Sequence, residues 1–169
     1  MIRLIGAALV AAGGAWLGYL AAKELRGQVR AVRQMAEGLA LLERELELSA
    51  PPLIQLLERG AARSGGPARA LFQGSLQGMD SLDRECFSAL WRRLVPECGG
   101  LSPEGQAVLL PLGDTLGRYG EDRQREALSA ARRRLEELAG RLEADSRRQG
   151  RVYQALGLSG GAFLVILLL

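Results

Sequence analysis

The sequence predicts an all-α protein in which a six-helix antiparallel bundle is held between two transmembrane helices. Uncharged apolar stretches occupy both ends of the 169-residue chain, and leucine and alanine recur at three- and four-residue spacing between them. This spacing is typical of amphipathic helices, and an aromatic content of 5% suits a helical bundle better than a β-sandwich. We expect an N-terminal transmembrane helix over residues 1–22, a cytoplasmic helical domain over 23–151 and a C-terminal transmembrane helix over 152–169.

The first apolar stretch, residues 4–22, has no charge over 19 residues. As a helix it would be about 28 Å long at ~1.5 Å per residue, close to the ~30 Å hydrocarbon core of a bilayer. A secretory signal peptide would carry its positive charge in front, whereas here most of it follows, from Lys23 onward. We therefore expect an uncleaved anchor with the N-terminus outside and the next domain in the cytoplasm. The alternative is a leader cleaved near Lys23.

The second apolar stretch, residues 155–169, is uncharged and follows a basic cluster formed by Arg147, Arg148 and Arg151. Its 15 residues would form a helix of about 22 Å, which is shorter than the ~30 Å core. Val152 and Tyr153 must then enter the membrane as well, or the bilayer must thin locally. Both termini are therefore expected outside the cytoplasm.

Small residues recur four apart in both apolar stretches, at Gly14 and Gly18 and again at Gly157 and Gly161. This spacing lets helices approach closely in lipid. It predicts either a hairpin of the two segments or a homo-oligomer formed through them, with membrane lipid around them.

Between the anchors, apolar stripes and breakers divide the chain into helices. A long helix continues from the first anchor to about residue 48, and Pro51 and Pro52 end it. Further helices are expected from Pro52, over 68–77, from Ser81 to about 94, from Ser102 and over 122–154. The stripe of the first helix consists of Leu25, Val29, Val32, Met35, Ala36, Leu39, Leu42 and Leu46.

Residues 108–124 are the least regular part of the interior. Pro111 stands within an apolar helical pattern, where proline costs ~3 kcal/mol, and Gly113 and Gly117 lie four apart beside it. We interpret the two glycines as one face on which another helix packs closely. A phosphate-binding loop is excluded, because the chain has no GxxxxGK[ST] motif and no strand precedes this stretch.

The composition argues against catalysis and against metal, cofactor or nucleic-acid binding. The chain has no histidine, its two cysteines, Cys86 and Cys98, fit no zinc spacing, and its net charge is +3. The cysteines are expected to be reduced. A catalytic nucleophile, base and orienting group cannot be assembled from these residues, so we do not expect an enzyme.

Two charged faces are candidate partner surfaces. One carries Glu43 and Glu47 at the end of the first long helix, and the other carries Arg132 and Arg133 on the last. Because charge runs on helices are often simply solvated, an exposed face without a partner is the alternative for both.

Three stretches carry a resemblance to a known family: residues 41–46 leading into Pro52, residues 112–117 followed by 122–124, and residues 156–168. In this order and at this chain length they resemble the stage III sporulation protein AB family of endospore-forming bacteria. The resemblance covers nearly the whole chain. The family often has Tyr-Gly-x-Thr-Pro-Leu where this chain has Leu-Ser-Ala-Pro-Pro-Leu at residues 48–53, so a partner contact through that tyrosine is in question.

The resemblance implies a membrane component of the channel-like complex between mother cell and forespore, on the mother-cell side of the septum. It implies a cytoplasmic domain similar to the helical domain of the type II secretion F protein, a platform that meets a secretion ATPase. The implied partners are the stage III sporulation AA ATPase of the same operon and other membrane proteins of the complex. The alternative function is a helical regulatory protein tethered to the membrane without a role in secretion.

Overall fold

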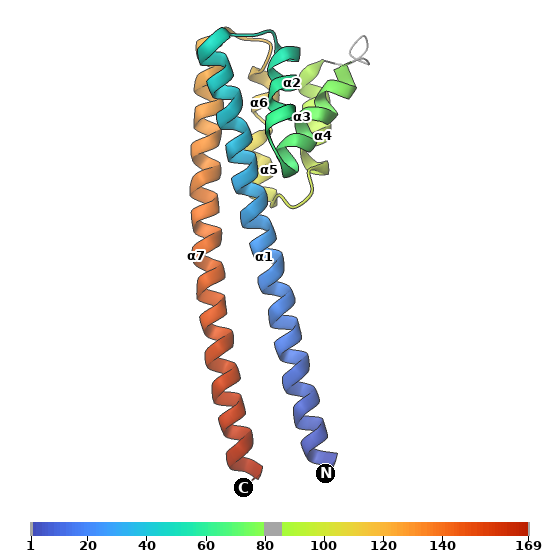
Figure 1. Ribbon diagram of the computed structural model, residues 1–169, viewed down its shortest axis with the longest axis vertical. Helices are drawn as coiled ribbons and strands as arrows, with labels where there is room; N and C mark the ends of the chain where they lie inside the picture. The colour runs from blue at the N-terminus through green and yellow to red at the C-terminus, as the bar shows by residue number, and fades with distance from the viewer. Residues whose placement is uncertain (1, 80–85, 169) are drawn as a thin grey trace. The chain divides into compact units, whose positions relative to one another are not determined.

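The computed structural model describes the backbone of residues 2–79 and 86–168, and the side chains of residues 13, 16, 23–79 and 86–148. Every regular element in these residues is an α-helix, so the predicted all-α class is confirmed (Figure 1). The helices are α1 (Ile2–Ser49), α2 (Leu53–Arg63), α3 (Gly66–Met79), α4 (Phe87–Glu97), α5 (Pro103–Leu109), α6 (Leu112–Thr115) and α7 (Glu121–Leu168).

The chain divides into two compact units. One combines Met1–Gly27 with Arg141–Leu169, and the other is Gln28–Gly140. The expected transmembrane segments, 1–22 and 152–169, fall in the first unit and lie almost entirely outside the described side chains, as do the glycines of the spacing pattern, Gly14, Gly18, Gly157 and Gly161. Among the described residues, no helix has an apolar run long enough to cross a bilayer.

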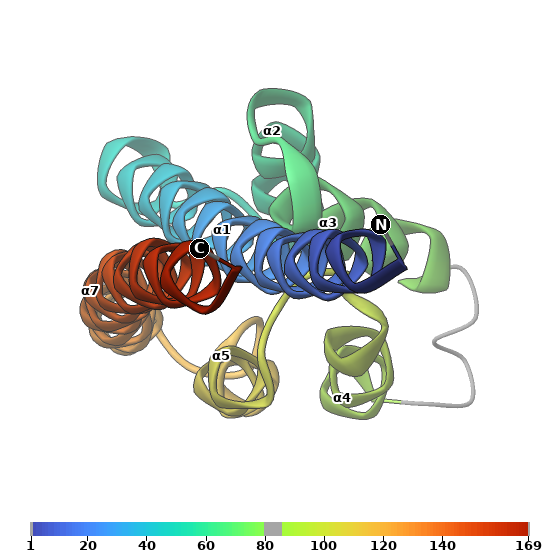
Figure 2. The same ribbon diagram turned by 90° about the horizontal axis from the view of Figure 1, so that it is seen from below.

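The unit Gln28–Gly140 is built around the later part of α1. The predicted stripe on this helix is buried from Val32 to Leu46, with Val32, Met35, Leu39 and Leu42 fully inaccessible to solvent, whereas Leu25 and Val29 are half-buried. Figure 2 shows α2 and α3 on one side of α1 and α5 and α7 on the other. In this position α1 contributes to the core along its whole length within the unit, which explains why its stripe is continuous.

Phe72 of α3 is packed between two glycines that belong to other helices. A Cβ atom added at Gly38 of α1 would lie 2.5 Å from the Cβ atom of Ala68 and 3.3 Å from the Phe72 ring. A Cβ atom added at Gly60 of α2 would lie 2.6 Å from Leu42 and 3.1 Å from Phe72. No larger residue fits at either position unless the neighbouring atoms shift. These glycines therefore set how closely α1, α2 and α3 approach one another.

Helix α7 runs antiparallel to α1 within this unit. Glu43 of α1 pairs with Arg132 of α7, whereas the earlier residue Ala36 lines a groove with the later residue Ala139. On α7 the apolar residues Leu128, Ala131, Leu135 and Leu138 are buried. The antiparallel relation expected for these two helices is therefore observed in this unit.

Pro111 divides the expected helix after Ser102 into two. Helix α5 begins as predicted, because the Ser102 side chain accepts a hydrogen bond from the Gly105 backbone N–H at 3.2 Å. It ends at Leu109, and Pro111 is the N-cap of the four-residue helix α6. The described residues of Gln28–Gly140 thus contain one more short helix than the six we expected, because a proline cannot continue the hydrogen-bond pattern of α5.

The interpretation of Gly113 and Gly117 as one helix face is wrong for Gly117. Gly113 lies in α6, but Gly117 follows the end of α6 and has a φ of +74°, a conformation that favours glycine. A Cβ atom at Gly117 would also lie 2.6 Å from the Leu53 side chain of α2. Both glycines are therefore sites of close approach, but they contact different helices.

Helix α4 begins later than predicted. Its N-cap is Cys86 rather than Ser81, which lies outside the described residues. Leu90, Trp91 and Val95 are buried on this helix, whereas Cys86 and Ala89 are exposed. The Trp91 indole is fully buried and its Nε1–H group donates to the Leu109 carbonyl oxygen.

Replacement of Gly113 by alanine is expected to destabilise the protein. The added Cβ atom would lie 2.7–2.9 Å from the Cδ1, Cβ and Cγ atoms of Trp91, and this indole cannot move freely because its Nε1–H is bonded to the Leu109 carbonyl oxygen. Overpacking of this kind costs about 1–3 kcal/mol, and chemical denaturation of the purified protein would measure it.

The matched control is Gly140→Ala, since Gly140 is also helical but a Cβ atom there has no neighbour within 4 Å. This control is expected to gain up to about 1 kcal/mol from helix propensity. Equal unfolding midpoints for the two variants would contradict the packing argument.

Candidate functional site

The two predicted partner surfaces meet in one ion-pair network. The Arg132 Nε–H group donates to Glu43 Oε2 at 2.9 Å, and its Nη1 donates to Glu136 Oε1 at 2.8 Å. The Arg132 and Glu43 side chains are partly buried, with 26% and 18% of their surface exposed. Hydrogen bonds from Arg132 to Glu43 and then to Glu136 raise the pKa of the guanidinium above its ordinary value. Glu43 and Arg132 thus neutralise each other.

The other two predicted surface residues remain exposed. Glu47 lies near the end of α1, and the Arg133 Nη2–H group donates to the Ser129 hydroxyl at 3.1 Å within α7. The structure therefore separates the four candidates into a neutralised pair, Glu43 and Arg132, and two residues that keep their charge at the surface.

A second charged cluster, which was not predicted from the sequence, is centred on Glu45. Glu45 has 8% of its surface exposed. Its carboxylate accepts hydrogen bonds from Arg59 at 2.9 Å and from Arg63 at 2.8 Å. Arg59 also donates to the Ser49 hydroxyl at 3.1 Å. The sequence contains two signs of this cluster. Glu45 follows Leu42 by three residues and so lies on the buried stripe, and Arg59 and Arg63 lie one turn apart on the next helix.

The charge of Glu45 makes the stability of the α1–α2 contact depend on pH. The hydrogen bond from Arg59 is the main cause that holds the pKa of Glu45 below its ordinary value of 4.5, and the charge of Arg63 acts in the same direction. A carboxylate with a lowered folded-state pKa stabilises the fold above its unfolded-state pKa, and this stabilisation is lost as pH falls through the folded-state value.

We expect Glu45→Gln to lower the unfolding temperature at pH 7, because two arginines lose their charged acceptor. The difference from the unmodified protein should shrink as pH falls from 4.5 through the lowered folded-state pKa of Glu45, because below that pKa Glu45 is protonated in both states. Thermal unfolding at a series of pH values measures this. The control is Glu47→Gln, two residues away and exposed. If the difference in unfolding temperature between Glu45→Gln and the unmodified protein stays constant with pH, the charge of Glu45 does not have this role.

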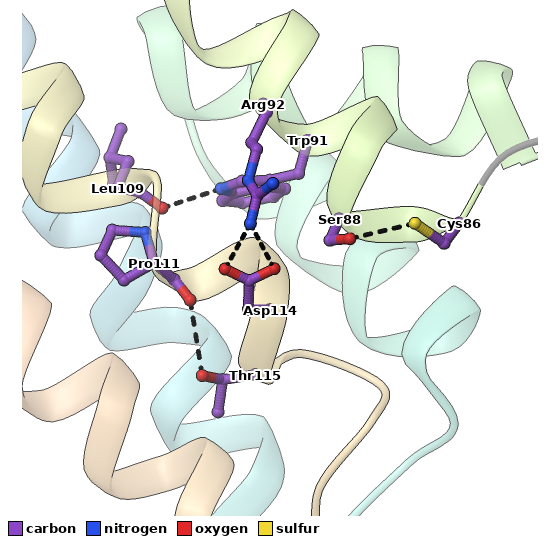
Figure 3. Close-up of polar contacts among 8 residues, drawn as sticks. All are labelled: Cys86, Ser88, Trp91, Arg92, Leu109, Pro111, Asp114 and Thr115. Atoms are coloured by element: carbon purple, nitrogen blue, oxygen red, sulfur yellow. Dashed lines mark hydrogen bonds and ion pairs between the residues drawn. The ribbon is translucent and has the colours of Figure 1, made fainter.

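A third group of polar contacts fixes α6 against α4 (Figure 3). The buried Trp91 Nε1–H group donates to the Leu109 carbonyl oxygen at 2.8 Å. Next to it, the Arg92 Nη2 atom donates to both Asp114 carboxylate oxygens, at 2.8 and 2.7 Å. The Thr115 hydroxyl donates to the Pro111 carbonyl oxygen at 3.4 Å. These bonds hold Gly113 against Trp91, so this region positions α4, α5 and α6 relative to one another.

Both cysteines are free thiols with opposite environments. Cys86 is exposed beside Ser88, and the hydrogen bond between their side chains is the main cause of a lowered pKa of the thiol. Burial raises the pKa of Cys98 to about 11. In the part of the chain with described side chains, no group of three or more His, Cys, Asp or Glu residues could hold a metal ion.

The fold and these surfaces define an all-α helical protein whose charged groups connect helices to one another. The family model for stage III sporulation protein AB matches residues 3–169, and the chain therefore belongs to the stage III sporulation protein AB family. The resemblance seen in the sequence is confirmed at the level of the family.

A curated protein and a solved structure are also similar to this chain. Stage III sporulation protein AB of Bacillus subtilis (strain 168) is 26% identical over 174 residues, with 100% of both chains covered. A solved structure of stage III sporulation protein AB (SpoIIIAB) is similar in fold, with a TM-score of 0.61 and 22% identity. The match covers 72% of this chain and 97% of that one.

Proposed function

We propose that the protein is a membrane-anchored platform in the channel-like complex between mother cell and forespore, and that it docks the stage III sporulation AA ATPase. The observation that carries this proposal is the family match over residues 3–169, which spans both apolar ends as well as the helical unit. We also propose that the helical unit resembles the type II secretion F domain in its role. Its work would be binding, without bond chemistry.

The charges at the surface limit how docking could occur. Glu43 and Arg132 already bind each other, so a partner would have to break a partly buried pair to use either charge. Glu47 and Arg133 are exposed and can meet opposite charges without that cost. Among the predicted residues, these two are therefore the better candidates for contacts with the ATPase.

Charge reversal tests this role. Glu47→Lys and Arg133→Glu are expected to reduce the amount of ATPase that co-purifies with the full-length protein, and more strongly at low salt, because exposed charges are screened at high salt. Matched controls are Glu58→Lys on α2 and Arg69→Glu on α3, both exposed. Full retention of the ATPase by both test variants would remove the charged-face hypothesis.

We further propose a double-pass topology, with both termini outside the cytoplasm and the helical unit inside. Cys86 is a natural reporter for the helical unit, since it is exposed with a lowered thiol pKa, whereas Cys98 is buried and poorly reactive.

A membrane-impermeant maleimide added to intact cells should leave Cys86 unlabelled and should label it after lysis. In a Cys86→Ser background, a cysteine introduced by Ile2→Cys should be labelled without lysis. Labelling of Cys86 in intact cells, or protection of the cysteine at position 2, would contradict this topology.

A further inference from the structure

An open groove of about 370 Å³ lies between α1 and α7 on the surface of the unit Gln28–Gly140. Its lining is made largely of small residues: Ala36 and Ala139 are buried, Ala40 is half-buried, and Gly140 is exposed. A Cβ atom at Gly140 would meet nothing within 4 Å, so there is free space above this residue. Short side chains on both helices therefore leave room that neither helix fills.

Carboxylates from both helices border this groove. Glu37 of α1 is exposed, and Glu136 of α7 is held by its hydrogen bond from Arg132. Arg33 also lines the groove, one helical turn before Glu37. A cationic group would thus be attracted to the Glu37–Glu136 part of the groove and disfavoured next to Arg33.

The shape and the charge together favour a helix from another protein. A groove that runs along two helices with a small-residue floor can receive the side chains of a third helix at a short interaxial distance. A second copy of this chain would place a hollow against a hollow in a symmetric contact, which would leave the free space unfilled. A polyanion such as nucleic acid would be repelled by the same two carboxylates.

We propose that this groove seats a helix of the docking partner, with aliphatic side chains over Ala36, Ala139 and Gly140 and a lysine or arginine near Glu37 and Glu136. This inference rests on the proposed function, since the partner is the ATPase named there. It places the contact on a surface that the sequence analysis did not select, next to the Glu43–Arg132–Glu136 network.

Two substitutions test the groove with little risk to the fold. Gly140→Leu fills the free space, and the unfolding midpoint should stay the same or rise, because leucine is the better helix former. Glu37→Lys reverses an exposed charge. In the full-length protein in detergent micelles, each is expected to weaken the affinity for the purified ATPase by about tenfold or more. The controls Ala70→Leu and Glu58→Lys, on α3 and α2, should stay within about twofold.

The outcomes separate this inference from the proposed function. If the unmodified protein does not bind the ATPase, the proposed function fails and the groove loses its partner. If the unmodified protein binds and both groove variants bind equally well, the groove inference is overturned while the proposed function stands. A change in oligomeric state without a change in ATPase affinity would also overturn it, because the groove would then be an interface between copies.

Discussion

The packing of Phe72 against two glycines is the constraint on which the rest of the helical unit depends. A Cβ atom added at Gly38 of α1 or at Gly60 of α2 would lie 3.3 or 3.1 Å from the Phe72 ring, and closer still to Ala68 or Leu42. Because the three helices approach this closely, steric exclusion as well as burial limits the register of α2 and α3 along α1. The buried leucines of α1 then face the same core without gaps.

Once α2 and α3 cover one side of α1, the other side is left for α5 and α7. On this side the contact is formed differently: α7 is joined to α1 by the Glu43–Arg132 pair at one point and is separated from it by a groove at another. Small residues on both helices explain the groove, because alanine and glycine bury little area and fill little space. These small residues therefore create the surface on which we propose that a partner binds.

The sequence predicted the features that repeat along one helix and missed those that join two. The stripe from Val32 to Leu46 and the cap at Ser102 follow from spacing and from local hydrogen bonding, so they could be predicted. The pairing of Glu43 with Arg132, 89 residues away, depends on tertiary structure and has no local signal. Gly117 was misplaced for a related reason: a glycine four residues from another suggests a helix face, and nothing local reveals a positive φ.

The dominance of arginine over lysine has a structural use here that composition alone did not suggest. The chain has 22 basic residues, and Lys23 is the single lysine. Arg132 binds two separate carboxylates through its Nε and Nη1 atoms, which a planar guanidinium with several donors can do and a lysine ammonium does less well. Because arginines such as this one are used between helices, the charges that remain for recognition are fewer than the composition suggests. Recognition of a partner must then depend on the shape of the surface as much as on its charge.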